Sequence, residues 1–522
     1  MKFLIHSQKI TLAEISKLHA ENNDLEIDFH EEVIRRVELS EKNFLNYFEK
    51  KTPIYGVTTG FGDSCHRSVR SEDSQELQDN LVSYLMMGSG KNLSQEVSAS
   101  MLLFRIVSLS RGFSGVSVKL LQKMKELYNK KIYPVVPCEG SLGASGDLIP
   151  LAYLANNVRG QGQVYYQNEI CDLEDLVAKG IYTPHKFRPK EGLALVNGTT
   201  SMTALSYHNY QLSRYLTEMS MLATGWLCLT IHGRKEAFGS LVNNQAKSFS
   251  GQGMAAARVR EILENEDYAT VQYSQIAQKD EHVTHLVQDP YSLRCAPQVI
   301  GPVQETLGLI QQWLETEING VSDNPLFDQE NDLANGGNFY GGYLAHSMDY
   351  LKICNANLAD LMDRQLTLLI SEKTNRGLTP NLANWENLSP EKRHLRHGLK
   401  AVHQNVSAVT SDIMAKAMPN SIFSRSSESH NQDKVSLGMT AAVQCQEQLE
   451  SMVTIMACYL CCLAQAIDLR KIELKGEVSR HYYQLIRSHI KFVEKDTRLD
   501  LSIAKLREVL ITEAREKGYV FV

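Results

Sequence analysis

Apolar residues recur along most of this chain at intervals of three and four, which places their side chains on one face of an α-helix. The clearest run predicts a helix over about residues 303–318, and it consists of Val303, Leu307, Ile310, Leu314 and Ile318. Pro302 stands where this helix would begin, and Asn319-Gly320 follows where it would end. The pattern therefore predicts a helix with both of its ends marked in the sequence.

Two further stripes predict helices near the two ends of the chain. One consists of Val33, Val37, Phe44 and Phe48, and the other of Leu499, Ile503, Leu506 and Leu510 with Gly518 as its stop. Strand patterns are sparse, and they are found at residues 132–136 and in a hairpin around residues 163–170. The chain is therefore predicted to be mainly helical.

We predict a mainly α fold, in which a bundle of long helices follows a mixed, loop-rich N-terminal region that carries a cofactor-forming turn. The N-terminal region covers residues 1–200, the central bundle residues 201–470 and the C-terminal helices residues 471–522. A chain of 522 residues is long enough for two to three domains. The boundaries are drawn from the helical patterns alone, because no low-complexity linker or repeat separates the segments.

Composition and charge limit the partners and the cellular compartment that we expect for this chain. The formal net charge is −6, from 54 basic and 60 acidic residues, and no basic block suited to phosphates is present, so we expect no nucleic-acid partner. Ten scattered cysteines without a paired CxxC pattern indicate reduced thiols. The apolar stretches at residues 219–233 and 451–467 fall below the length of about 20 that a membrane span needs. We therefore expect a soluble, cytoplasmic protein with no membrane partner.

Motifs of three other protein classes fail at specific positions. Gly88-Ser89-Gly90-Lys91 resembles a phosphate-binding loop, but Leu85 and Asn92 stand where that loop needs glycine and serine or threonine. Two pairs of histidines three residues apart, His282 with His285 and His394 with His397, lack the glutamate-containing HExxH pattern. No GxSxG sequence surrounds a serine. We therefore expect no nucleotide site, no metal and no common hydrolase.

The most informative segment is residues 140–151, Gly-Ser-Leu-Gly-Ala-Ser-Gly-Asp-Leu-Ile-Pro-Leu. Its small residues allow a turn tight enough for the Gly146 nitrogen to attack the Ala144 carbonyl carbon. Loss of two waters, one of them from the Ser145 hydroxyl, would give 4-methylideneimidazol-5-one, an electrophile that no standard side chain provides. The alternative is an ordinary glycine-rich turn before a helix, with Asp147 as an acid favoured by the helix dipole.

This segment closely resembles the signature of the histidine and aromatic amino-acid ammonia-lyase family. The resemblance covers roughly residues 50–470, with further matching segments at 54–62, 193–199, 287–298, 319–328 and 336–341. It implies that Ala144, Ser145 and Gly146 form methylideneimidazolone autocatalytically and that no external cofactor is needed. The implied reaction is the non-oxidative elimination of ammonia from a small-molecule aromatic amino acid.

The resemblance also implies roles for single residues. Tyr55 is the catalytic base, Asn197 hydrogen-bonds the ring carbonyl or the substrate amine, and Tyr291 assists at the amine or the ring. Arg294 and Asn324 hold the substrate carboxylate, the arginine because its planar guanidinium can bind both oxygens. Phe339 forms a wall of the pocket. One mild departure is Ser322, which stands where the family usually has asparagine.

Two positions bear on the substrate. Gln432 stands where histidine lyases have glutamate, so the pocket lacks a charge for an imidazolium, and Glu428 lies four residues earlier on what could be the same helix face. Tyr84-Leu85 matches none of the family's usual pairs, although Leu85 agrees with the aromatic lyases. We expect phenylalanine, tyrosine or a substituted aromatic amino acid, which gives a trans-arylacrylate. The alternatives are an aromatic 2,3-aminomutase, a histidine ammonia-lyase giving urocanate, and a catalytically silent helical scaffold.

The predicted helix at residues 303–318 also bears on assembly. It separates Arg294 from Asn324 by more than about 20 Å, since a helix rises about 1.5 Å per residue. One copy of the chain therefore cannot easily bring both residues to one small substrate unless the flanking loops fold back. The family that this chain resembles agrees with this expectation, since it forms homotetramers whose active sites are built from three chains. We expect a homotetramer with shared active sites.

Overall fold

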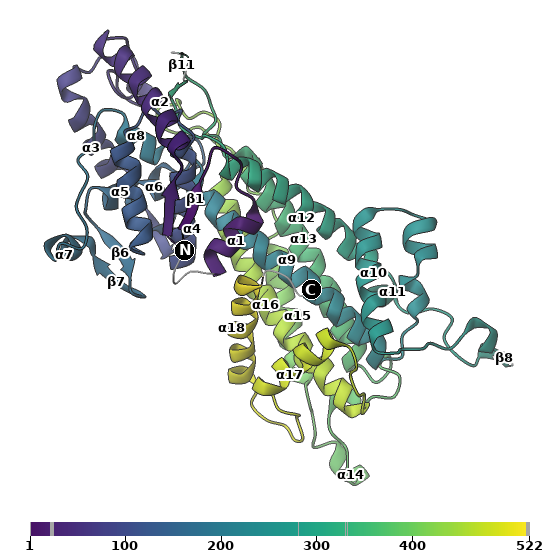
Figure 1. Cartoon of the computed structure of the whole chain (residues 1–522). Coiled ribbons are helices and arrows are strands. Elements are labelled where there is room, and N and C mark those ends of the chain that lie inside the picture. The colour runs from purple at the N-terminus through teal and green to yellow at the C-terminus, as the bar shows by residue number, and fades with distance from the viewer. Residues whose placement is uncertain (1, 21–25, 280, 329, 331, 518–522) are drawn as a thin grey trace. The chain divides into compact units, whose positions relative to one another are not determined.

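The computed structural model describes residues 2–20, 26–279, 281–328, 330 and 332–517, and it is mainly helical (Figure 1). The predicted fold class is thereby confirmed. The chain divides into two compact units that are interleaved along the sequence. Unit 1 comprises Met1–Asn209, Ile310–Asp349 and Pro419–Cys445, and unit 2 comprises Tyr210–Leu309, Tyr350–Met418 and Gln446–Val522. The three consecutive domains proposed from the sequence stay a prediction.

The first part of unit 1 contains eight helices within the described residues. They are α1 (Leu12–Ala20), α2 (Glu31–Glu49), α3 (Ser74–Tyr84), α4 (Gln95–Ser110), α5 (Val118–Asn129), α6 (Leu148–Val158), α7 (Leu173–Ala178) and α8 (Glu191–Val196). Val33, Val37 and Phe44 of α2 are buried, as the periodicity predicts. Ser94 caps α4 by accepting a hydrogen bond from the Val97 N–H.

Short strands accompany these helices. The predicted hairpin is present, because β6 (Gln163–Tyr166) pairs antiparallel with β7 (Glu169–Asp172), and β4 (Tyr133–Pro134) joins β6. The parallel pair β1 (Lys2–Ile5) and β2 (Glu26–Phe29) has no counterpart in the sequence prediction. Four further strands form two antiparallel pairs, β3 (Ser89–Asn92) with β5 (Pro137–Glu139) and β10 (Leu326–Phe327) with β11 (Leu333–Ala334). In unit 2, β8 (Gln278–Lys279) pairs with β9 (His282–Val283).

Four long helices contain four of the five boundaries between the units in the sequence, and the fifth lies between Met418 and Pro419. These helices are α9 (Thr200–Thr230), α12 (Ala296–Ile318), α13 (Gly342–Ile370) and α16 (Gly438–Leu469). The predicted start of α12 at Pro302 was wrong, because the helix begins six residues earlier and includes this proline. Pro302 lacks the N–H that would bond to the Gln298 carbonyl, but Ile300 and Val303 beside it are fully buried and hold the helix in place.

The remaining helices of unit 2 are α10 (Ser250–Asn265), α11 (Tyr291–Arg294), α14 (Pro390–Arg393), α15 (Lys400–Ala415), α17 (Glu477–His489) and α18 (Asp500–Glu516). Ile503, Leu506 and Leu510 of α18 are buried as predicted, whereas Gly518 lies outside the described residues.

Helix α16 is long and apolar enough to cross a membrane by length and composition. Its most apolar window is 83% buried inside the structure, so it forms part of a protein core. The stretch at 451–467 is thus a segment of a longer helix than the sequence suggested. The cytoplasmic location stays a prediction.

Candidate active site

The glycine-rich segment 140–147 forms a tight turn directly before α6. Gly143 and Gly146 have φ angles of +63° and +70°, a region that favours glycine. Gly146 forms a bridge with Gly198, and a Cβ atom at Gly146 would lie 2.0 Å from the Gly198 carbonyl oxygen. The next N–H, that of Asp147, donates to the same oxygen at 2.7 Å. This close approach admits no side chain at Gly146.

Asp147 directly precedes α6, but its side chain connects the turn to α9. It occupies the N-cap position of α6, but its side chain makes no capping bond there. Its two carboxylate oxygens instead accept from the Ser141 hydroxyl at 2.8 Å and from the Met202 N–H, in the first turn of α9, at 2.7 Å. Full burial raises the pKa of Asp147 to about 7 despite these hydrogen bonds.

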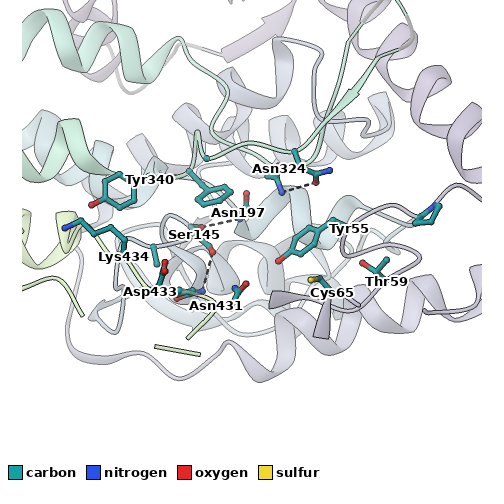
Figure 2. Close-up of a pocket in the computed structure, with 16 residues that line it drawn as sticks. Tyr55, Thr59, Cys65, Ser145, Asn197, Asn324, Tyr340, Asn431, Asp433 and Lys434 are labelled. Atoms are coloured by element: carbon teal, nitrogen blue, oxygen red, sulfur yellow. Dashed lines mark hydrogen bonds between the residues drawn. The ribbon is translucent and has the colours of Figure 1, made fainter. Parts of the chain in front are cut away.

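Two amide side chains from other segments reach Ser145 at the centre of the turn (Figure 2). Asn197 donates to the Ser145 carbonyl oxygen at 3.4 Å, and Gln432 donates to the Ser145 hydroxyl at 3.3 Å. The Asn197 Oδ1 atom is buried and has no hydrogen-bond partner among the described residues. A buried acceptor without a partner is costly, so this atom is suited to accept a hydrogen bond from a bound group.

These features fit the formation of a ring from the chain at this turn. The two residues after Ala144 are a half-buried serine and a glycine whose Cα lies against Gly198. An amide donor already reaches the Ser145 carbonyl. The residues present can therefore hold a methylideneimidazolone group.

Two cavities of unit 1 meet at Ser145. The first cavity has a volume of about 630 Å³, and the second has about 270 Å³. Both are lined by Tyr55, Ala144, Ser145, Asn197 and Gln432. Ser145 therefore borders two cavities whose linings differ in polarity.

The first cavity is more polar than the second and contains Asn324 and Phe339. Asn324 accepts from the Gly336 N–H at 2.8 Å and donates to Asn335 at 3.5 Å (Figure 2). The sequence analysis missed Asn335, although it directly precedes the Gly336-Gly337 motif. It also missed Lys434, which lies two residues after Gln432 and lines the same cavity.

The second cavity is more apolar and contains Tyr84 and Leu85, together with Leu81, Leu193 and Phe61. Desolvation raises the pKa of the Tyr84 hydroxyl to about 12, and the nearby charge of Glu428 adds to this effect. The phenol is therefore neutral at physiological pH and can donate a hydrogen bond. The apolar part of this lining suits an aromatic ring.

Tyr55 lies where the two cavities meet, on the glycine-rich loop at 54–62. Its hydroxyl oxygen accepts a hydrogen bond from the Gly62 N–H at 2.9 Å. Burial raises the pKa of Tyr55, the Gly62 N–H opposes this by favouring the ionised form, and Glu428 raises it further. The backbone thus fixes the position of the tyrosine oxygen beside both cavities.

The segment that carries Glu428 and Gln432 is a tight hairpin, so the prediction of a shared helix face was wrong. Glu428, Ser429 and His430 have positive φ angles of 52°, 51° and 68°, which a right-handed helix excludes. Ser427 and Gln432 pair across the hairpin through two backbone hydrogen bonds. Glu428 and Gln432 nevertheless both line the second cavity.

Tyr291 and Arg294 lie in unit 2, and they line neither the first nor the second cavity. Arg294 donates through Nε to the Asp289 carbonyl at 2.9 Å, and its guanidinium carbon lies 4.5 Å from the centre of the Tyr291 ring. It lines a third cavity of about 620 Å³ in unit 2 with Arg234, Asp289 and Gln298. The other eleven predicted site residues all line the first or the second cavity.

Across the described ranges, no group of three or more histidine, cysteine, aspartate or glutamate side chains could hold a metal ion.

Comparison with known proteins gives a consistent result. A family model described as "Aromatic amino acid lyase" matches residues 10–488. The chain is 32% identical to a histidine ammonia-lyase from Natranaerobius thermophilus, over 98% of this chain and 97% of that protein.

Two solved structures are similar over nearly their whole length. A phenylalanine aminomutase from Pantoea agglomerans has a TM-score of 0.92 and 30% identity, over 99% of this chain and 100% of the other. A tyrosine aminomutase from Streptomyces globisporus has a TM-score of 0.92 and 26% identity, over 99% and 98%.

Proposed function

Because the chain belongs to the aromatic amino acid lyase family, we propose that it eliminates ammonia from phenylalanine or tyrosine and releases a trans-arylacrylate. The observation that carries this proposal is the position of Ser145, which lies between two amides where a polar and an apolar cavity meet. An α-amino acid has a charged end and an aryl end, and the two cavities match these ends in character.

We further propose that Ala144, Ser145 and Gly146 form methylideneimidazolone, which supplies an electrophile for the departing amine. Asn197 would hold this group, since it already donates to the Ser145 carbonyl oxygen, which stays in the ring. Gln432 donates to the Ser145 hydroxyl, which leaves as water when the ring forms. The unpartnered Asn197 Oδ1 atom would accept a hydrogen bond from an N–H of the substrate amine.

The other side chains of unit 1 divide between the two ends of the substrate. Tyr55 would accept the β-proton, with its oxygen held by the Gly62 N–H. Asn324 would bind the carboxylate in the first cavity, with Phe339 as a wall beside it. Tyr84 and Leu85 would surround the aryl group in the second cavity.

Arg294 would complete the carboxylate site from another copy of the chain. It precedes α12 and Asn324 follows that helix, which has 23 residues and is therefore about 35 Å long. We propose a homotetramer in which each active site combines unit 1 of one copy with the Arg294 and Tyr291 segment of others.

The choice of an aryl substrate is supported by Gln432 and by the apolar lining around Leu85. An imidazolium would find no charge partner in Gln432, and Glu428 is the carboxylate in this lining that could offer one to histidine. Histidine is the competing substrate, since relatives such as the Natranaerobius protein are named histidine ammonia-lyases. A 2,3-aminomutase is the competing outcome, since the two similar solved structures carry that name.

Incubation of the purified protein with phenylalanine, tyrosine and histidine separately tests the proposal. We expect ammonia and an arylacrylate from phenylalanine or tyrosine, and no activity in Ser145→Ala. The intact mass of the wild type should lie two waters below the mass of the sequence. Urocanate as the main product would contradict the aryl substrate, a β-amino acid would indicate an aminomutase, and full activity in Ser145→Ala would overturn the mechanism.

A further inference from the structure

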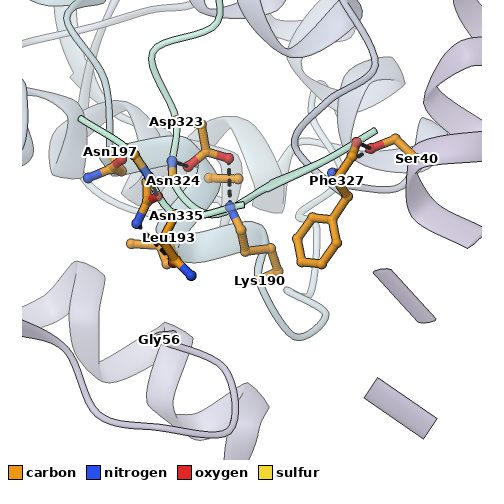
Figure 3. Close-up of polar contacts among 12 residues, drawn as sticks. Ser40, Gly56, Lys190, Leu193, Asn197, Asp323, Asn324, Phe327 and Asn335 are labelled. Atoms are coloured by element: carbon orange, nitrogen blue, oxygen red, sulfur yellow. Dashed lines mark hydrogen bonds and ion pairs between the residues drawn. The ribbon is translucent and has the colours of Figure 1, made fainter. Parts of the chain in front are cut away.

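A buried ion pair lies next to the two amides of the candidate site. Lys190 Nζ is 2.6 Å from the Asp323 Oδ2 atom, and both side chains are completely buried (Figure 3). Neither residue lines the first or the second cavity. The pair therefore does not touch a substrate bound there.

Each member of the pair adjoins a segment that carries one of the amides. Lys190 is the residue before α8, a helix of six residues that ends directly before Asn197. Asp323 directly precedes Asn324, and its Oδ1 atom accepts the Asn324 N–H at 2.7 Å. The ion pair thus connects the base of the Asn197 helix to the backbone of Asn324 (Figure 3).

The Asn197 end of this connection has a second anchor. The buried guanidinium of Arg105 donates to the Asn197 carbonyl at 2.6 Å and also to the Ala194 carbonyl. A Cβ atom at Gly198 would lie 2.2 Å from Arg105 Nη1, so this cation fills the space beneath the turn. Asn197 is therefore fixed at its backbone, and α8 transmits the position of Lys190 to it.

Stability alone is a weak explanation for this pair. Removing two charges from water is costly, and well-packed apolar side chains in their place are often at least as stabilising. Lys190 also has a φ of +81°, a conformation that residues other than glycine adopt at a cost. Lys190 and Asp323 each adjoin one segment of the candidate site. Their ion pair therefore fixes the distance between these two segments.

We propose that Lys190 and Asp323 are positioning residues that set the separation of the Asn197 and Asn324 amides across the first cavity. This inference rests on the proposed function, because it assigns the two amides to the amine and carboxylate of one substrate. Loosening the pair leaves both amides present but changes the distance between them. A displacement of about 1 Å can lower a rate by as much as a hundredfold.

The double variant Lys190→Met/Asp323→Asn tests this directly, because it removes both charges and keeps an oxygen at residue 323 for the Asn324 N–H. We expect the melting temperature to stay within about 3 °C of the wild type and kcat to fall at least about tenfold. The matched control is Arg487→Met/Asp468→Asn, which removes a partly buried ion pair of unit 2. This control should leave kcat within about twofold of the wild type.

Two further measurements separate positioning from a structural role. The intact mass of the double variant should still lie two waters below its sequence mass. In a Ser145→Ala background, the double variant should weaken binding of a trans-arylacrylate at least about fivefold by calorimetry. Asp323→Glu keeps the charge and moves the carboxylate by one methylene, so a lower kcat in this variant supports the proposal even if the double variant does not fold.

Unchanged kcat in a folded double variant would overturn the inference. A lower kcat would also overturn it if the intact mass showed that the variant had not lost the two waters. Unchanged kcat in Asp323→Glu would also overturn it. These failures are distinct from failure of the proposed function, which would appear as a wild type that releases no ammonia from any of the three amino acids.

Discussion

Unit 1 and unit 2 hold their candidate functional groups by different means. In unit 1 the backbone dominates, since Gly146 lies against Gly198 and Tyr55 is held by a peptide N–H. In unit 2 one buried carboxylate organises the segment before Arg294, because Asp289 accepts from the Arg234 N–H at 2.6 Å and forms an ion pair with Arg376. The turn therefore depends on main-chain geometry, whereas the segment before Arg294 depends on a side-chain network around Asp289.

The largest expected effect comes from the backbone-held group of unit 1. Tyr55→Phe should lower kcat/KM by about 10²- to 10⁴-fold, the range for a general base. Because the pKa of Tyr55 is raised and the ionised form is the base, wild-type kcat/KM should increase as the pH rises from 7 to 10. Rate measurements across this range would reject the assignment if Tyr55→Phe retained both the activity and the pH dependence.

The next largest effect concerns the charged group of unit 2. Arg294→Met should raise KM and lower kcat/KM by about 30- to 5,000-fold, because a carboxylate loses a bidentate partner worth about 2–5 kcal/mol. Its intact mass should still show the loss of two waters, since the turn lies in unit 1. Steady-state kinetics with Arg294→Lys as the comparison would reveal whether the planar fork or only the charge is required.

Mixed oligomers compare the two units in one experiment. Ser145→Ala and Arg294→Met, coexpressed with different tags and purified through both, should show more activity than either variant has alone. The control mixture, Ser145→Ala with Asn197→Ala, should recover none because both changes lie in unit 1 at one turn. Absence of recovery in the first mixture would show that a complete site does not combine different copies.

The smallest expected effect is on stability. The pKa of Asp147 is about 7 in the folded chain and about 3.9 for an unperturbed aspartate, so its contribution to stability is present below pH 4 and is lost as the pH rises to 7. Asp147→Asn has no such titration. The melting temperature of the wild type relative to this variant should therefore fall between pH 5 and pH 8, and a constant difference would contradict the raised pKa.

Local patterns predicted the elements well where one residue type decides the structure. The stripe from Val303 to Ile318 marked the end of α12 correctly, because Asn319-Gly320 stops the helix. It missed the start, because burial of Ile300 outweighs the hydrogen bond lost at Pro302. The four-residue spacing of Glu428 and Gln432 was misleading, since three consecutive positive φ angles depend on tertiary contacts that no local pattern contains.

The site residues were predicted in a similarly uneven way. Motifs pointed to Asn197 and Asn324 because these positions carry a recognisable sequence around them. Nothing local distinguishes Lys190 from a solvated surface lysine, since its partner Asp323 is 133 residues away. Arg105 is equally inconspicuous within the apolar sequence of α4. Buried polar residues whose partners are distant in the sequence could therefore be recognised only from the folded structure.

The interleaving of the two units has a consequence for biosynthesis. Unit 1 needs residues up to Cys445, and unit 2 begins at Tyr210 but draws on segments up to the end of the chain. During translation, neither unit has all of its strands and helices until most of the polypeptide has left the ribosome. This chain therefore cannot complete an N-terminal domain before most of it has been synthesised. Its apolar helices must be protected from aggregation while the last third of the chain is being made.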